Sequence, residues 1–185
     1  VRHGLDEATA LTVEAALIDA LPSLTNRVAG HGVVDGRIPL DGLVRRYGAV
    51  PVPKHAPPAL LIRLGPWLDE RRRMPGGTFR RGHGYFEGMD EAELLDSLRG
   101  WWRVNPERVQ RAGIEHAVAV FEGRSVGVAG IRAWAQRADG RWAFAVEPAT
   151  AGARRAWLGP HGRRIELAFG AQNPVAYWAS GTHPP

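Results

Sequence analysis

The chain has 185 residues, no cysteine and a formal net charge of +5, with an isoelectric point near 10.6. These values exclude disulfides and thiolate metal sites, and no apolar run approaches the roughly 20 residues that a membrane-spanning helix needs. We find no secretory signal segment, so the sequence predicts a cytoplasmic protein. Lys54 is the only lysine among 24 basic residues. Arginine suits contacts with phosphates, base edges and aromatic rings, and a GC-rich genome is the alternative explanation for this bias.

Residues 8–21 are predicted to form a helix. Asp6 is a candidate N-cap, and no glycine or proline interrupts the run before Pro22. On a helical wheel Glu14 falls within the apolar face. A buried carboxylate needs a cation, a metal ion or hydrogen-bond donors. Glu14 is therefore either a site residue or a side chain that reaches solvent or a nearby arginine.

Three features identify the first 32 residues further: the segment Val13–Asp19, the segment Leu24–Asn26 and the tripeptide Gly30–Gly32. Together they resemble the latter half of a GIY-YIG endonuclease domain, in the branch related to the LEM-domain nucleases. The resemblance implies that Glu14 binds the catalytic divalent metal ion, Mg²⁺, and that Asn26 supports the site. It also implies DNA as the partner more than RNA.

The same family needs two tyrosine-bearing strands and an arginine before the glutamate helix, and no tyrosine precedes Glu14 here. A metal ligand without those partners is not expected to hydrolyse a phosphodiester bond. The sequence therefore predicts a nuclease remnant that is inactive as given. The alternative is an active metal-dependent endonuclease whose front part is missing from this sequence.

A proline-rich passage, residues 51–58, leads out of this segment. We place the domain boundary at its start, which assigns residues 1–50 to the partial nuclease segment and connector, and residues 51–185 to a second domain. Residues 59–64 are predicted to form a buried strand at the beginning of that second domain.

A loop rich in arginine, glycine and aromatic residues follows at positions 69–89. Arginines beside aromatic rings are typical of loops that track phosphates and stack on bases, and a solvated surface loop is the alternative. The candidate nucleic-acid contacts in this loop are Arg71, Arg72, Arg80 and Arg81.

The remaining pattern predicts two short helices and several strands. Residues 90–98 begin with a D-x-x-E cap, and Asn105-Pro106 opens a second helical turn. Strands at 116–121, 126–134 and 141–146 with short connections predict a meander. Further strands are predicted at 101–104, 165–169 and 175–178. Ser125 matches a G-x-S-x-G pattern, but between two strands, so we do not predict a nucleophile there.

Four segments carry a second resemblance: Arg99–Trp102, His116–Val120, Gly127–Trp134 and Gln172–Tyr177. From residue 59 onward the chain resembles the PUA-like superfamily, which includes the EVE and YTH readers. This implies a mixed β-barrel that binds nucleic acid and accepts a base in an aromatic pocket. The candidate pocket residues are Trp102, Trp134 and Trp178, with Arg103 and Arg132 at the rim, and burial in the core is the alternative for each tryptophan.

The fold class predicted is therefore α+β, with an N-terminal helical remnant of a GIY-YIG-like domain and a PUA-like mixed β-barrel. The predicted function is nucleic-acid binding by the second domain. Mg²⁺ is expected only if the nuclease interpretation holds, and no other cofactor is expected. A module that binds only other proteins is the third possibility.

Overall fold

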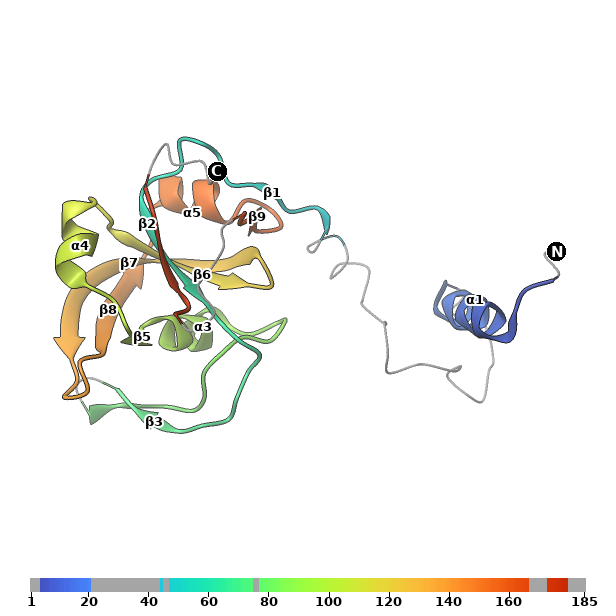
Figure 1. Cartoon of the computed structure of the whole chain (residues 1–185), viewed down its shortest axis with the longest axis horizontal. Helices are drawn as coiled ribbons and strands as arrows, with labels where there is room; N and C mark the ends of the chain where they lie inside the picture. The colour runs from blue at the N-terminus through green and yellow to red at the C-terminus, as the bar shows by residue number, and fades with distance from the viewer. Residues whose placement is uncertain (1–3, 21–43, 45–46, 75–76, 167–172, 180–185) are drawn as a thin grey trace. The chain divides into compact units, whose positions relative to one another are not determined.

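The computed structural model describes residues 4–20, 44, 47–74, 77–166 and 173–179 (Figure 1). The chain divides into two compact units, Val1–Leu43 and Val44–Pro185, whereas the proline-rich passage predicts the boundary between residues 50 and 51. In the first unit the described element is helix α1, Glu7–Ala20. The predicted N-cap is confirmed, because the Asp6 carboxylate accepts a hydrogen bond from the Thr9 backbone N–H at 2.9 Å.

The second unit contains a mixed sheet and three described helices. The sheet strands are β1 (Val50–Pro51), β2 (Ala59–Arg63), β5 (Gly100–Trp102), β6 (His116–Phe121), β7 (Arg124–Gln136), β8 (Trp142–Pro148), β9 (Arg163–Arg164) and β10 (Val175–Trp178). A separate two-stranded ribbon pairs β3 (Arg72–Arg73) with β4 (Phe79–Arg80), and the helices are α3 (Glu91–Leu98), α4 (Pro106–Arg111) and α5 (Ala151–Trp157).

The strand order is β1-β9-β7-β6-β2-β10, and β8 joins β7 to β5. Two pairs, β2 with β6 and β1 with β9, are parallel, and the other pairs of this sheet are antiparallel. The α+β prediction is confirmed, and so is the antiparallel meander β6-β7-β8. Strand β7 pairs with three strands: with β6 along its first half, with β8 along its second half, and with β9 at Arg124. The pairing with β8 has a register shift between Ile131 and Ala133.

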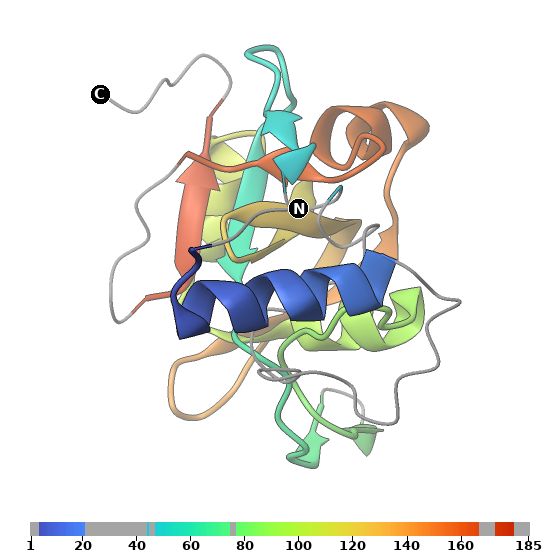
Figure 2. The same cartoon turned by 90° about the vertical axis from the view of Figure 1, so that its right-hand side faces the viewer.

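The central strands are buried on both faces. On β2, Leu60 and Ile62 face one apolar cluster with α3 and α4, whereas Leu61 faces a second cluster with α5. This two-sided burial explains why the strand reads as a continuous apolar run and does not alternate. Both views place α5 and the β3–β4 ribbon at opposite ends of the second unit (Figure 1 and Figure 2).

Three sequence predictions differ from the structure. The segment 69–89, predicted to be a loop, contains the paired strands β3 and β4. The pattern at residues 149–164 predicts irregular structure, but this segment contains α5, whose N-cap Thr150 accepts a hydrogen bond from the Ala153 backbone N–H at 3.2 Å. Strand β9 ends at Arg164, and Ile165 and Glu166, the first two residues of the strand predicted at 165–169, do not lie in a strand; residues 167–169 lie outside the described residues. None of the described helices is long and apolar enough to cross a membrane.

Candidate nucleic-acid interface

The β3–β4 ribbon presents arginine against an exposed aromatic ring. Its register sets Arg73 opposite Phe79. Phe79 is 53% exposed, and the guanidinium carbon of Arg71 lies 4.4 Å from the centre of its ring. This distance is that of a cation–π pair. The ribbon therefore carries a positive charge held over an aromatic face at the protein surface.

A second pair of the same kind lies beside the ribbon. The Trp101 indole on β5 donates a hydrogen bond to the carbonyl oxygen of Arg73 at 3.3 Å, and the Arg137 guanidinium carbon is 5.3 Å from the Trp101 ring. Arg137 lies in the turn between β7 and β8, outside both strands. The ribbon, β5 and this turn thus share one surface, which we call the ribbon–turn surface; its members are Arg71, Arg73, Phe79, Trp101 and Arg137.

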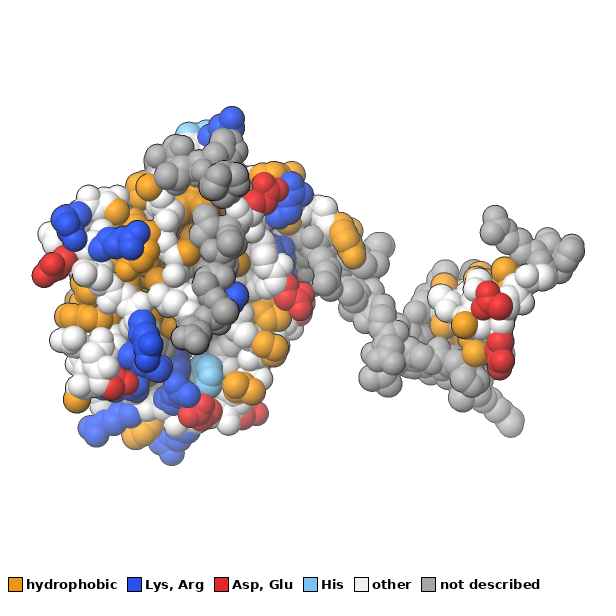
Figure 3. Space-filling model, viewed as in Figure 1, with side chains coloured by type: hydrophobic (Ala, Val, Ile, Leu, Met, Phe, Trp, Pro, Cys, Tyr) orange, Lys and Arg blue, Asp and Glu red, His pale blue; other side chains and the backbone are white. Residues whose placement is uncertain are grey.

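Charge on this surface is partly balanced by a carboxylate. Arg137 donates to Asp139 through Nε at 3.0 Å. This hydrogen bond lowers the pKa of Asp139 to about 2, with a contribution from the Arg141 backbone N–H, and it raises the pKa of Arg137. Figure 3 shows several basic side chains, with acidic ones among them, over the end of the second unit where Figure 1 places β3 and the β7–β8 turn. Arginine side chains gathered in this way favour a polyanionic partner.

Arg80, one of the four loop arginines predicted to contact nucleic acid, is buried and stabilises the fold. It is 4% exposed, and its guanidinium donates to the carbonyl oxygens of Asp96, Ser97 and Gly100 at 3.3, 3.4 and 2.7 Å. These carbonyls lie at and beyond the C-terminal end of α3, where helix carbonyls lack intrahelical partners. Burial lowers the pKa of Arg80 to about 10. Arg80 therefore caps α3 and is not available to a phosphate.

The other two loop arginines take part in exposed ion pairs. Arg72 donates to Glu70 at 2.7 Å. Arg81 lies 3.4 Å from Glu93 and 3.8 Å from Asp69, and its guanidinium carbon is 5.6 Å from the Trp67 ring. Both side chains lie at the surface beside carboxylates, so they add less positive potential than their number suggests.

The three tryptophans predicted to line a pocket occupy different environments. Trp178 is 8% exposed and packs edge-to-face on Trp157 within the second apolar cluster. Trp102 is half-buried and donates its indole N–H to the Leu98 carbonyl at 2.7 Å. Trp134, also half-buried, lies 6.5 Å from Trp142, centre to centre, in an edge-to-face contact. The indole of Trp178 belongs to the core, while Trp102 and Trp134 lie at the margin of the first cluster.

The arginines predicted for the pocket rim do not meet at one place. Arg132 is exposed and pairs with Glu147 of β8. Arg103 is exposed after β5, and its carbonyl oxygen accepts from Asn173 at 3.5 Å. Ser125, where no nucleophile is predicted, is fully buried. Its hydroxyl donates to the Trp157 carbonyl oxygen and accepts from the Arg163 backbone N–H.

Of the two residues predicted for the metal site, Glu14 lies among the described residues and Asn26 does not. Glu14 is exposed on α1, as are Val13 and Leu17 of the apolar face that the helical wheel predicts. Within the described ranges, no three His, Asp or Glu side chains are grouped closely enough to hold a metal ion.

Of the ribbon–turn surface, sequence reasoning named Arg71 as a site residue and placed Arg73 and Phe79 only within the arginine-rich loop. It missed Trp101 as a ring and Arg137 as its cation. They are 36 positions apart and come together only because β5 pairs with β8 beside the β7–β8 turn. It also missed Arg108 on α4, whose guanidinium carbon lies 4.1 Å from the Tyr177 ring. No family model, no curated protein and no solved structure matches the chain.

Proposed function

We propose that the second unit binds nucleic acid through the ribbon–turn surface, as a reader module of the PUA-like type. We propose further that residues 1–50 are a GIY-YIG-like nuclease segment that is inactive in this chain. The observation that carries the binding proposal is the pair of arginine–ring contacts, Arg71 over Phe79 and Arg137 beside Trp101. Each combines a phosphate-binding cation with a ring on which a base can stack.

Base stacking and phosphate neutralisation would both contribute to the binding free energy. A base that stacks on an aromatic side chain contributes about 1–3 kcal/mol, and each arginine that neutralises a phosphate releases a condensed counterion. Phe79 is exposed enough to be reached without rearrangement. Arg73, the fifth member, is exposed on β3 directly opposite Phe79. The surface therefore suits a chain of phosphates and bases better than an isolated anion.

The barrel interpretation is supported by the way the sheet edges are linked. Strand β10 lies at one end of the strand order, and β5 lies at the end of the branch through β8. The Asn105 backbone N–H, just after β5, donates to the Tyr177 hydroxyl of β10 at 3.0 Å, and Asn173 donates to the Arg103 carbonyl. Side-chain hydrogen bonds thus connect the two edges, in support of a partly open barrel.

Reversal of three charges tests the binding proposal. The variant with Arg71, Arg73 and Arg137 all changed to Glu should lose most of its affinity for DNA and RNA oligonucleotides. The slope of log affinity against log salt should become shallower by roughly 0.7–0.9 for each phosphate that is no longer neutralised. The matched control changes three other exposed arginines, Arg111, Arg155 and Arg164, to Glu. It has the same net charge but an intact ribbon–turn surface.

Equal losses in the two triple variants would show that only net charge matters. Absence of binding by the unchanged chain, at low salt and with both polymers, would refute the proposal. DNA is the expected preference because residues 1–32 resemble an endonuclease segment, and oligonucleotides of equal sequence in DNA and RNA form test this directly.

A further inference from the structure

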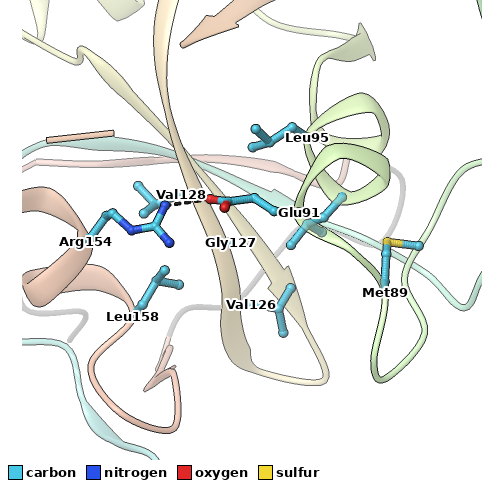
Figure 4. Close-up of a pocket in the computed structure, with 9 residues that line it drawn as sticks. Met89, Glu91, Leu95, Val126, Gly127, Val128, Arg154 and Leu158 are labelled. Carbon is cyan, nitrogen blue, oxygen red and sulfur yellow. Dashed lines mark hydrogen bonds and ion pairs between the residues drawn. The ribbon is translucent and has the colours of Figure 1, made fainter. Parts of the chain in front are cut away.

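A small hollow in the second unit lies away from the ribbon–turn surface. It has a volume of about 200 Å³ and is formed by α3, β7 and α5. Apolar side chains make most of its wall, and the polar members are Glu91 and Arg154 (Figure 4). The apolar lining residues are Met89, Leu94, Leu95, Val126, Val128 and Leu158. None of them carries a ring, so the hollow offers no stacking face for a base.

The floor of the hollow is strand backbone. Gly127 has no side chain, and a Cβ there would lie 2.7 Å from Cδ2 of Leu94, so glycine lets α3 approach β7. On its outer side β7 pairs with β9 at Arg124 and with β8 from Ala129 onward. Among the described strands, Gly127 and Val128 are therefore paired on the β6 side alone, and Val126 lies at the register shift between the pairs made by Ser125 and Gly127. A short length of strand edge faces the hollow, and such edges pair with main-chain groups of ligands.

Two charged side chains lie at the opening of the hollow, one carboxylate and one guanidinium. Oε1 of Glu91 on α3 and a guanidinium nitrogen of Arg154 on α5 are 2.6 Å apart. Figure 4 shows the two side chains reaching toward one another across β7. Both are well exposed, at 61% and 44% for their side chains, and exposed ion pairs of this kind are weak. A ligand with its own ammonium and carboxylate can therefore separate the pair at small cost.

We propose that this hollow binds a free α-amino acid with a branched aliphatic side chain. The side chain fills the apolar wall, the α-ammonium pairs with Glu91, and the α-carboxylate pairs with Arg154. Size limits the ligand to a small molecule, because a cavity of about 150 Å³ accommodates one small ring, and the apolar lining without rings offers that ligand aliphatic contacts. The hollow, with a volume of about 200 Å³, is therefore large enough for one aliphatic side chain with its α-carbon.

L-Leucine is the probe for the test, titrated into the full chain by calorimetry or followed by ligand-observed NMR. We expect saturable, weak binding. Three analogues each remove one interaction: 4-methylpentanoate lacks the ammonium, L-leucinamide lacks the carboxylate, and glycine lacks the side chain. Each should bind at least about tenfold more weakly than leucine, which corresponds to about 1.4 kcal/mol of binding free energy.

Two variants test the residues, Glu91→Gln and Arg154→Gln, and both side chains are exposed enough to be replaced without loss of the fold. Each should reduce leucine affinity by about tenfold. The matched controls, Glu166→Gln and Arg164→Gln, break another exposed ion pair of 2.9 Å and should leave leucine affinity unchanged. Charge reversal on the ribbon–turn surface should also leave it unchanged, which separates this inference from the proposed function. The inference is overturned if leucine does not bind, if the analogues bind as well as leucine, or if the hollow and control variants behave alike.

Discussion

The indole N–H of Trp101 donates to the carbonyl oxygen of Arg73, across 28 positions of sequence. This hydrogen bond fastens a ring of the sheet to the two-stranded ribbon that carries Arg73 and Phe79. Two arginine–ring pairs from separate parts of the fold are thereby held on one surface. Because the donor is the indole nitrogen, a substitution can remove the hydrogen bond and still keep an aromatic ring at position 101.

Replacement of Trp101 separates these two roles. Trp101→Ala removes a stacking face, so we expect a loss of about 1–3 kcal/mol in affinity for single-stranded oligonucleotides, measured by fluorescence anisotropy. Trp101→Phe keeps a ring but cannot donate to Arg73, and its loss should be smaller. The control is Phe86→Ala, because Phe86 is exposed and packs on Trp67 outside the ribbon–turn surface. If Phe86→Ala costs as much as Trp101→Ala, stacking at this surface is not what binds the ligand.

Asp139→Asn should change affinity in the opposite direction. The Asp139 carboxylate accepts hydrogen bonds from the Arg137 guanidinium and partly neutralises its positive charge. Neutralising it frees Arg137 for a phosphate, so binding should become tighter and its salt dependence steeper by up to roughly 0.7–0.9 in slope. Glu166→Asn is the control, since Glu166 neutralises Arg164 away from this surface. Weaker binding by Asp139→Asn would contradict the proposal that Arg137 contacts a phosphate.

Arg80→Met should destabilise the second unit. The substitution leaves the carbonyl oxygens at the end of α3 without their donor, and a buried polar group without a partner costs about 1–3 kcal/mol. Urea denaturation should show this loss as a lower midpoint. Arg81→Met is the matched control, because the Arg81 side chain is 68% exposed, and its midpoint should shift little. Equal midpoints for the two variants would mean that Arg80 does not cap α3.

Arg80 and Arg81 also differ in a way that the sequence alone could not predict. Local signals were sufficient for the caps at Asp6, Asp90 and Asn105, because each cap bonds to a residue three positions away. The meander followed from short turns between apolar runs. Neighbouring arginines in a glycine-rich loop look alike in sequence, and only the packing of β4 against the end of α3 decides that one is buried. The Trp101–Arg137 pair depends in the same way on strand pairing across the sheet.

Glu14→Gln tests the enzyme alternative. We expect the purified chain to show no Mg²⁺-dependent nicking of supercoiled DNA, and Glu14→Gln to be indistinguishable from it. Mg²⁺ needs further oxygen ligands and an activated water for phosphodiester hydrolysis, and the described residues group no such set around Glu14. Glu7→Gln, on the same helix, is the control. Nicking that is lost in Glu14→Gln and kept in Glu7→Gln would make the chain a nuclease.

His83 should make the stability of the second unit depend on pH. Burial is the main cause that lowers the pKa of His83 from 6.5, followed by the charges of Arg72 and Arg80; Glu70, 3.7 Å away, acts in the opposite direction. A histidine whose pKa is lower in the folded state contributes stability that is fully present at pH values above its pKa in the unfolded chain. That contribution is lost as pH falls through the folded value.

The urea concentration at the unfolding midpoint should therefore decrease as the pH is lowered from 7.5 to 5. This range lies roughly on either side of an unperturbed imidazole pKa of about 6.5. His83→Gln cannot take up this proton, so its midpoint should fall less over the same interval. The control is His55→Gln, because His55 is exposed, and its midpoint should follow that of the unchanged chain. If His83→Gln instead falls as steeply as His55→Gln, protonation of His83 is not coupled to unfolding.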